Sequence, residues 1–147
     1  AGSGGFHAAM KLPFLSKQPR VAVLRLAGVI AARGGLSPSG VSATATGPLI
    51  ERAFAMKRLA GVVLVVNSPG GSAAQSSLIA QRIRRLADEK KVPVIACVED
   101  AAASGGYWLA CAADEIVADP ASILGSIGVI SAGFGLGDAI GRWGVER

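Results

Sequence analysis

The chain has 147 residues, of which 51% are hydrophobic, and a formal net charge of +5. This length suffices for about one domain with its own core. No uninterrupted apolar stretch approaches the ~20 residues that cross a bilayer, so we expect a soluble chain. Its basic residues are scattered and only 5% of its residues are aromatic, which excludes the footprint of a nucleic-acid binder.

The beginning of the chain shows no periodicity. Residues 1–19 open with Ala-Gly-Ser-Gly-Gly, and we interpret them as a disordered leader or as residues added for expression. The folded domain is therefore expected at residues 20–147. The only histidine, His7, lies in the leader. Because a Ser-His-Asp triad needs a histidine that is held rigidly, we interpret His7 as incidental.

The first half of the domain contains two apolar runs typical of strands, at 21–26 and 61–66. The second run is rich in β-branched residues, as expected for a central strand covered on both faces. Residues 30–46 are rich in Gly, Ser, Thr and Pro and predict a loop. Pro48 is expected to open a helix that ends at about Leu59. The apolar stripe of that helix is predicted to comprise Leu49, Ala53, Met56 and Leu59 or Ala60.

The second half continues this alternation. Ser72 and Gln75 form a capping-box pattern at the start of a helix that runs to about Lys90. Its buried residues are expected to be Leu78, Ile79, Ile83, Leu86 and Ala87. The other expected elements are strands at 92–98, 115–117 and 127–131 and helices at 107–113 and 136–143. Strands that alternate with helices predict a parallel α/β sheet with right-handed crossovers.

Two groups of residues have both a structural and a functional interpretation. The basic group on the long helix is either a solvated face or a site for anionic lipid headgroups, and comprises Arg82, Arg84, Arg85, Lys90 and Lys91. Cys97 and Cys111 lie among small apolar neighbours and are expected to be reduced core residues. Because neither a Cys-x-x-Cys pair nor a nearby histidine accompanies them, the sequence predicts no metal site and no cofactor.

Ser104 is the first candidate for chemistry. It lies where the apolar run 92–98 is expected to give way to the alanine-rich helix 107–113. Free backbone N–H groups at such a junction favour the negative charge that a carbonyl oxygen acquires under nucleophilic attack. Gly105 and Gly106 would let a substrate backbone come close. The structural alternative, in which Ser104 only caps the helix, stays open on these residues alone.

A second turn has the same character. The run 61–66 ends in Asn67-Ser-Pro-Gly-Gly-Ser72, which places a glycine pair ahead of a helix. Two strand-to-helix turns of this kind could place two sets of N–H donors around one point. That is the arrangement that an acyl-transfer oxyanion hole requires.

Four motifs, in this order, resemble the signal peptide peptidase A (protease IV) family of serine peptidases. They are Asn67-Ser-Pro-Gly-Gly71, Ala102-Ala-Ser-Gly-Gly-Tyr107, Ala113-Asp-Glu-Ile-Val-Ala118 and Ser122-Ile-Leu-Gly-Ser-Ile-Gly-Val129. The resemblance covers about residues 20–147, and its Ser-Pro-Gly-Gly turn is shared with the wider Clp protease and crotonase superfamily. It implies a Clp/crotonase-type spiral of ββα units with a parallel sheet.

The resemblance also implies roles for individual residues. Ser104 corresponds to the nucleophile, and the backbone N–H groups of Gly71 and Gly105 correspond to the oxyanion hole. Gly70 and Gly106 are implied at the substrate-binding surface.

The family resembled here uses a Ser/Lys dyad whose lysine lies well beyond the serine in sequence. This chain has no lysine after Lys91, and its lysines lie in the leader or on polar helix surfaces. Ser126 corresponds to a serine that orients the catalytic lysine, or else it is a turn or strand-edge hydroxyl. We therefore expect residues 20–147 to be a peptidase core domain without its C-terminal part, and this chain to hydrolyse peptides poorly.

For the whole protein, the resemblance implies a serine endopeptidase that degrades signal peptides and other apolar peptides. It also implies assembly into a homo-oligomeric ring, location at the cytoplasmic membrane and contact with the membrane surface. Two alternatives stay open. A crotonase-type acyl-CoA enzyme would use the same N–H donors on a thioester and needs a carboxylate, for which Asp100 is the nearest candidate. A non-catalytic scaffold would keep the fold and bind peptides or partner subunits.

Overall fold

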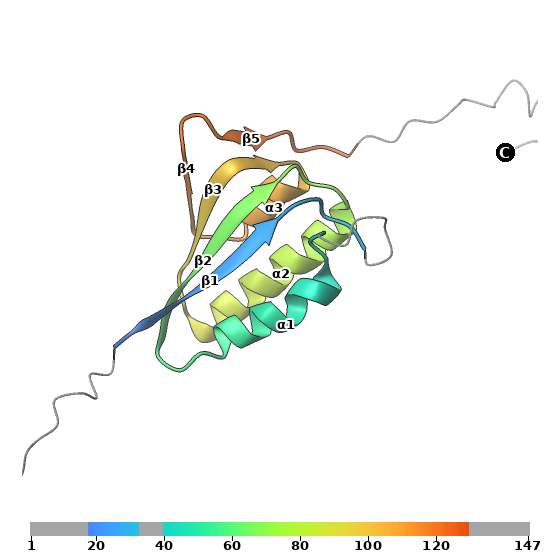
Figure 1. The fold of residues 1–147 in the computed structure, drawn as a ribbon. Coiled ribbons are helices and arrows are strands. Elements are labelled where there is room, and N and C mark those ends of the chain that lie inside the picture. Colours follow the sequence, from blue (N-terminus) through green and yellow to red (C-terminus); the bar gives the residue numbers. More distant parts are fainter. Residues whose placement is uncertain (1–17, 33–39, 130–147) are drawn as a thin grey trace, which may run out of the picture.

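The computed structural model describes residues 18–32 and 40–129 of the chain. In this part of the chain, five strands form one sheet and three helices lie on the same face of it (Figure 1). Every strand pairing is parallel. The predicted parallel α/β sheet is therefore confirmed.

The sheet has the strand order β1-β2-β3-β4, and β5 pairs with β3 farther along that strand. The strands are β1 (Arg20–Ala27), β2 (Leu59–Ser68), β3 (Val94–Ala103), β4 (Glu115–Ala118) and β5 (Ile123–Gly125). Because all of them run in one direction, their carboxyl ends meet at the same edge of the sheet. Binding sites of open parallel sheets lie at this edge.

The core lies between the sheet and the helices α1 (Ala43–Phe54), α2 (Ala73–Lys90) and α3 (Gly105–Ala110). Alternate strand residues point towards the helices, so Leu24, Leu64 and Ala96 are neighbours across the sheet and are all buried. The largest side chains that the helices bury against them are Ile50, Phe54, Ile79, Ile83 and Leu109. Burial of this apolar surface is the main driving force for folding.

The first helix begins and ends earlier than predicted. It starts at Ala43 because the Ser42 hydroxyl caps it, accepting a hydrogen bond from Ala45 N–H at 3.2 Å. Pro48, which was expected to open the helix, lies inside it. The helix cannot extend to Leu59, because that residue opens β2.

The predicted apolar stripe of α2 is confirmed at Ile79, Ile83, Leu86 and Ala87, and that of α1 at Ala53, but each helix exposes one residue that was expected to be buried. Leu49 on α1 is 52% exposed, whereas its neighbour Ile50 is fully buried. Leu78 on α2 is 54% exposed, whereas Ser76 and Ala80 are buried. Where two adjacent helix residues are both apolar, periodicity alone does not decide which of them faces the core, and packing against the sheet decides it at these two positions.

The start of α2 agrees with the prediction, but its capping box is incomplete. The Ser72 hydroxyl accepts from Gln75 N–H, as an N-cap does. The Gln75 side chain does not reach back to Ser72. Its Oε1 accepts from Ala43 N–H at 2.8 Å instead, so Gln75 joins the first turns of α1 and α2.

Two expectations near the end of the described residues are wrong. β3 continues past its predicted end at residue 98 to Ala103, because Ala101–Ala103 pair with β5. The strand expected at 127–131 is absent from its described part, since residues 126–129 form no strand and β5 lies at Ile123–Gly125. Residues 130–131, the helix expected at 136–143 and His7 lie outside the described residues.

The two cysteines are less buried than predicted. Cys97 is half-buried and Cys111 is exposed, so the expectation that both are core residues is wrong. Cys111 directly follows α3, a helix of only six residues, and this short helix leaves it at the surface.

Asp114 fastens the connection between α3 and β4. Its Oδ2 accepts from Val94 N–H at 2.8 Å, and Arg84 of α2 donates to its Oδ1 at 2.8 Å and to Ala112 O. The hydrogen bond from Val94 N–H, followed by the Arg84 guanidinium, lowers the pKa of Asp114. One member of the basic group on α2 therefore serves to hold the fold together.

Replacing Asp114 by alanine should lower the free energy of unfolding at neutral pH by about 1–2 kcal/mol, because two hydrogen bonds are lost. A carboxylate with a lowered pKa stabilises the fold above its unfolded pKa of about 3.9, and this contribution disappears as the pH falls through the folded value. Urea unfolding between pH 7 and pH 3 should therefore show the variant and the parent chain converging below about pH 4. The exposed carboxylate of Glu89 supplies the control, and Glu89→Ala should change stability by less than about 0.5 kcal/mol. A difference for Asp114→Ala that is constant with pH would contradict this account.

Candidate active site

Two glycine-bordered turns meet at the carboxyl edge of the sheet. One joins β2 to α2 and contains Gly70 and Gly71, and the other joins β3 to α3 and contains Ser104. They approach so closely that a methyl group on Gly70 would lie 2.9 Å from Ser104 Cβ and 2.8 Å from Gly105 N. The structure therefore brings together the two turns that the sequence singled out.

The turn after β2 is held from both sides. Ile30 N–H donates to Gly70 O at 2.8 Å, and Ser72 N–H donates to Ile30 O at 2.7 Å, so Ile30 brackets Gly71. The Ser68 hydroxyl accepts from Gly70 N–H at 3.1 Å. Gly71 has a φ of 143°, and a Cβ there would collide with Ile30 O. None of these bonds uses the N–H of Gly71.

Ser104 lies directly between β3 and α3 in a backbone conformation that is rare for a residue with a side chain. Its φ is 51° and its ψ is −118°. Its N–H donates to Gly125 O at 2.7 Å, and its carbonyl accepts from Trp108 N–H at 3.0 Å, so β5 and α3 both hold the turn. The hydroxyl makes no capping hydrogen bond. A strained serine between strand and helix is the backbone arrangement of a nucleophile elbow.

Ser104 lines a cavity of about 380 Å³. The turn after β2, the turn after β3 and the segment after β5 enclose it, with lining residues Gly71, Ala73, Ser104, Gly105, Trp108, Ile127, Gly128 and Val129. None of these side chains carries a charge. The cavity can therefore accept an uncharged, apolar group next to Ser104.

Gly105 also lines this cavity. As the first residue of α3, its N–H has no partner within the helix. Gly105 itself is buried, and a Cβ there would collide with the Ser76 hydroxyl. Glycine at this position therefore lets α3 begin against α2, next to Ser104.

The remaining predicted site residues lie beside the cavity rather than around it. A Cβ on Gly106 would lie 2.5 Å from Ser68 O, so this glycine allows α3 to pack on the turn after β2. Gly70 makes the close approach to Ser104 described above. Ser126 is exposed with a φ of 53° and immediately precedes the lining residue Ile127.

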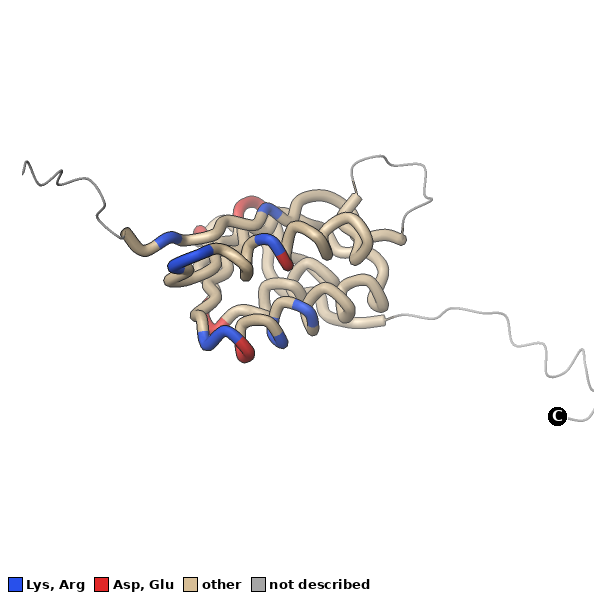
Figure 2. Tube along the Cα trace, turned by 90° about the horizontal axis from the view of Figure 1, so that it is seen from below, with Lys and Arg blue, Asp and Glu red and all other residues tan. Residues whose placement is uncertain are grey.

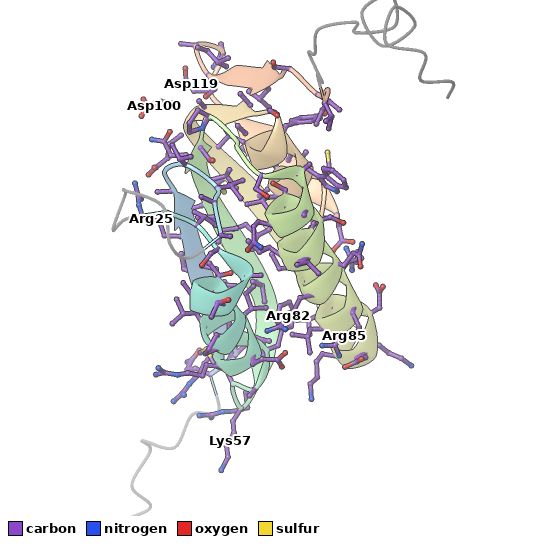
Figure 3. All side chains as sticks on the ribbon, turned by 90° about the vertical axis from the view of Figure 1, so that its right-hand side faces the viewer. Arg25, Lys57, Arg82, Arg85, Asp100 and Asp119 are labelled. Carbon is purple, nitrogen blue, oxygen red and sulfur yellow. The ribbon has the colours of Figure 1, made fainter. Side chains whose placement is uncertain are left out.

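Among the described residues, no lysine lies near Ser104. Lys90 and Lys91 are at the far end of α2, whose 18 residues span about 27 Å from the turn that contains Gly71. Lys57 lies at the opposite end of the molecule from Asp119, which precedes β5 (Figure 3). Figure 2 shows the charged residues concentrated towards the end where β1 begins and α2 ends. A general base for Ser104 is therefore not supplied by the described lysines.

Asp100, the carboxylate that an acyl-CoA enzyme would need, lies outside this cavity. Its Oδ2 accepts from the Asn67 amide at 2.7 Å. It lines a separate hollow of about 230 Å³ with Asp119 and Ser122, and Ser104 has no part in that hollow. This placement gives the acyl-CoA alternative no support.

Sequence reasoning missed the walls of the cavity. Trp108 is 41% exposed, and Ile127 and Val129 are exposed as well. All three lie in or next to the quoted motifs, but an apolar residue in a motif is equally compatible with the core. Large apolar side chains that stay exposed beside a serine become visible only in the folded chain.

The chain is similar to known proteins in both its sequence and its fold. The family model described as peptidase family S49 matches residues 86–147. The chain is also 39% identical over 132 residues to the chloroplastic serine protease SPPA of Arabidopsis thaliana, an alignment that covers 87% of this chain and 19% of the protease. The chain belongs to peptidase family S49. The resemblance seen in its motifs is thereby confirmed, and a peptidase is the activity class of the family.

A second relative of this S49 chain carries a different name. The chain is 47% identical over 134 residues to the Na(+)/H(+) antiporter NhaA of Brucella melitensis. The alignment covers 91% of this chain but only 18% of the antiporter. Because the alignment covers so small a part of the antiporter, the similarity is no evidence that this chain transports ions. The chain spans less than a fifth of the length of both relatives.

A solved structure shares the fold. A variant of the membrane-bound stomatin-specific protease 1510-N matches with a TM-score of 0.58 and 23% identity, covering 77% of this chain and 50% of that one. At this identity the likeness concerns the fold alone, and it confirms the predicted Clp/crotonase-type α/β class. Within residues 18–32 and 40–129, no helix of the S49 chain is long and apolar enough to span a membrane.

Proposed function

We propose that this chain carries the nucleophile and the oxyanion hole of a serine peptidase of the Ser/Lys dyad type. Ser104 is the nucleophile, and the N–H groups of Gly71 and Gly105 form the oxyanion hole. The observation that carries the proposal is the strained backbone of Ser104, a residue that lines a cavity together with both glycines and whose hydroxyl makes no capping hydrogen bond.

The chemistry follows from these groups. Ser104 Oγ forms a bond to the carbonyl carbon of the scissile peptide while its proton passes to a base. The carbonyl π electrons move onto the oxygen, where two N–H donors offset the negative charge. Collapse of this intermediate breaks the C–N bond, the amine leaves with a proton from the same base, and water then hydrolyses the acyl-enzyme.

The base is proposed to be a lysine, and within the described residues no lysine of the same chain supplies it. A lysine amine must lose its proton to act as a base, which requires burial or a nearby positive charge to lower its pKa. Lys57, Lys90 and Lys91 are exposed and far from Ser104. Ser126, next to the cavity, is proposed to orient the incoming amine. The chain by itself is then a poor peptidase.

The proposed substrates are apolar peptides in extended form, such as signal peptides. Support comes from the cavity, whose lining has no charged side chain and includes Trp108, Ile127 and Val129. Assembly into a ring at the membrane surface is proposed from the family resemblance, and a ring would bring a neighbouring subunit close enough to complete each site.

The rate of covalent modification by a fluorophosphonate tests the nucleophile and the missing base separately. Intact mass and peptide mapping of the 147-residue chain should show slow modification, confined to Ser104. Added ethylamine should accelerate it in proportion to the concentration of the neutral amine, since a general base contributes about 10²–10⁴-fold. Fast modification that is independent of added amine would show that the chain holds its own base. No modification of Ser104 even with the amine would refute the nucleophile.

A further inference from the structure

β1 is the edge strand on one side of the described sheet, and a groove lies between it and α1. Its volume is about 680 Å³, and its walls include Val21, Val23 and Arg25 of β1 and Leu49 and Arg52 of α1. β1 is two strands away from β3, which leads to Ser104, so the groove is about 10 Å or more from that turn. No lining residue is shared between the groove and the Ser104 cavity.

One side of β1 has no strand partner among the described residues. Within residues 18–32 and 40–129, β1 ends the sheet, because it pairs with β2 alone. The N–H groups of Arg20, Gly28 and Ile30 donate to the β2 side. Since backbone groups of successive strand residues point to alternate sides, the N–H and C=O groups of Val21, Val23 and Arg25 face outwards, along the groove. An unpaired strand edge of this kind is a template for another strand.

The side chains around this edge suit an apolar strand. Val21, Val23 and Leu49 are each more than half exposed, although all three are large hydrophobic residues. They lie on either side of the β1 edge, so an added strand could place alternate side chains against α1 and against the valines. Edge strands are usually protected by charges, bulges or proline; β1 has Arg20 and a register shift at its start and Arg25 farther along, but Val21 and Val23 between them remain exposed.

The charge of the groove selects among the possible occupants. Its lining contains Arg25 and Arg52 and no carboxylate. Arg25 is paired with Glu99, whereas Arg52 makes no ion pair within the described part of the chain. Arg20 and Arg58 are exposed at the start of the strand. A second copy would bring an equally basic edge against this one, which like-charge repulsion disfavours.

We propose that the outer edge of β1 binds an extended peptide by strand addition, and that the peptide alternates apolar residues with acidic ones. Backbone hydrogen bonds to Val21, Val23 and Arg25 supply the attachment, the exposed valines take the apolar side chains, and Arg52 of α1 selects the carboxylates on the other face of the added strand. Strand addition is a common way to recognise peptides, in which main-chain bonds give affinity and alternate side chains give specificity. The site is independent of the proposed peptidase centre.

The test uses a fluorescein-labelled peptide, Thr-Val-Glu-Val-Thr-Val-Glu, and fluorescence polarisation with the 147-residue chain. Saturable binding is expected, together with at least about tenfold weaker binding of a version with lysine in place of glutamate. Arg52→Glu should reverse this preference. Lys90→Glu makes the same change of charge at the end of α2, outside the lining of the groove, and should leave both affinities within about twofold.

Two further changes test the backbone contacts. Val23→Pro removes only an outward N–H and should weaken binding about tenfold or more, because proline is tolerated on the free side of an edge strand. If that variant fails to fold by circular dichroism, a peptide N-methylated at alternate residues gives the same test. Ser104→Ala should bind the peptide like the parent chain. The proposal is overturned by unsaturable binding up to about 1 mM, by unchanged affinity after N-methylation, or by dimerisation that Val23→Pro abolishes.

Discussion

Replacing Ser104 by alanine is expected to abolish modification of the chain by a fluorophosphonate. The same change should lower the residual hydrolysis of an apolar p-nitrophenyl ester by on the order of 100-fold, since a site without its nucleophile retains only binding and oxyanion stabilisation. An ester is the suitable substrate, because its leaving group needs no proton and the missing base matters less. Both rates can be followed on one preparation, by intact mass and by absorbance.

Ser77→Ala is the matched control for the Ser104 variant. Ser77 lies on α2, where its hydroxyl accepts a hydrogen bond from Gln81, and it does not line the cavity. Its replacement should leave both rates within about twofold and the fold unchanged. Equal rates for the parent chain and Ser104→Ala would show that the activity comes from another group and would remove the basis of the proposed mechanism.

A methyl group on Gly71 is expected to be the most damaging single substitution for the fold. Gly71→Ala would place a Cβ against the backbone oxygen of Ile30 and force a side chain onto a φ of 143°. Strain and overpacking together should cost about 3 kcal/mol or more. Thermal unfolding should therefore show a Tm lower by roughly 10 °C. The modification of Ser104 should slow as well, because Gly71 N–H moves with the turn.

Gly125→Ala separates backbone strain from overpacking as the cause of the lower stability. Gly125 also has a positive φ, 105°, but no atom lies within 4 Å of a Cβ built there. Its replacement should cost only the backbone strain, about 1–2 kcal/mol. Equal destabilisation by Gly71→Ala and Gly125→Ala would mean that the contact with Ile30 yields easily and that the turn after β2 is not rigid.

The position of Ser104 could be predicted from the sequence because local signals agree there. The run 92–98 is apolar and partly β-branched, the segment after it favours a helix, and two glycines stand between. The strand lengthens to Ala103 in the structure, which leaves Ser104 as the single residue between strand and helix. Parallel strands bring their carboxyl ends to one edge, so the nearness of Gly71 and Ser104 followed from the topology as well.

The errors arose where tertiary packing overrides local preference. Gly47-Pro48 predicts the boundary of a helix. In the structure the helix begins earlier, at the Ser42 cap, and continues through both residues. The exposure of Leu49 could not be foreseen, because its stripe and that of Ile50 differ by one position on the helix. Trp108 and Val129 line the same cavity, but they come from segments whose relative placement depends on β5 pairing with β3. A strand of three residues leaves little trace in the sequence.

A crystal structure of the 147-residue chain modified at Ser104 by a peptidyl phosphonate tests the central claim most directly. The account predicts a phosphonyl oxygen at about 2.7–3.1 Å from both Gly71 N and Gly105 N, with the neighbouring apolar side chain in the cavity beside Trp108. An adduct on another residue, or an oxygen that points away from both amides, would contradict it.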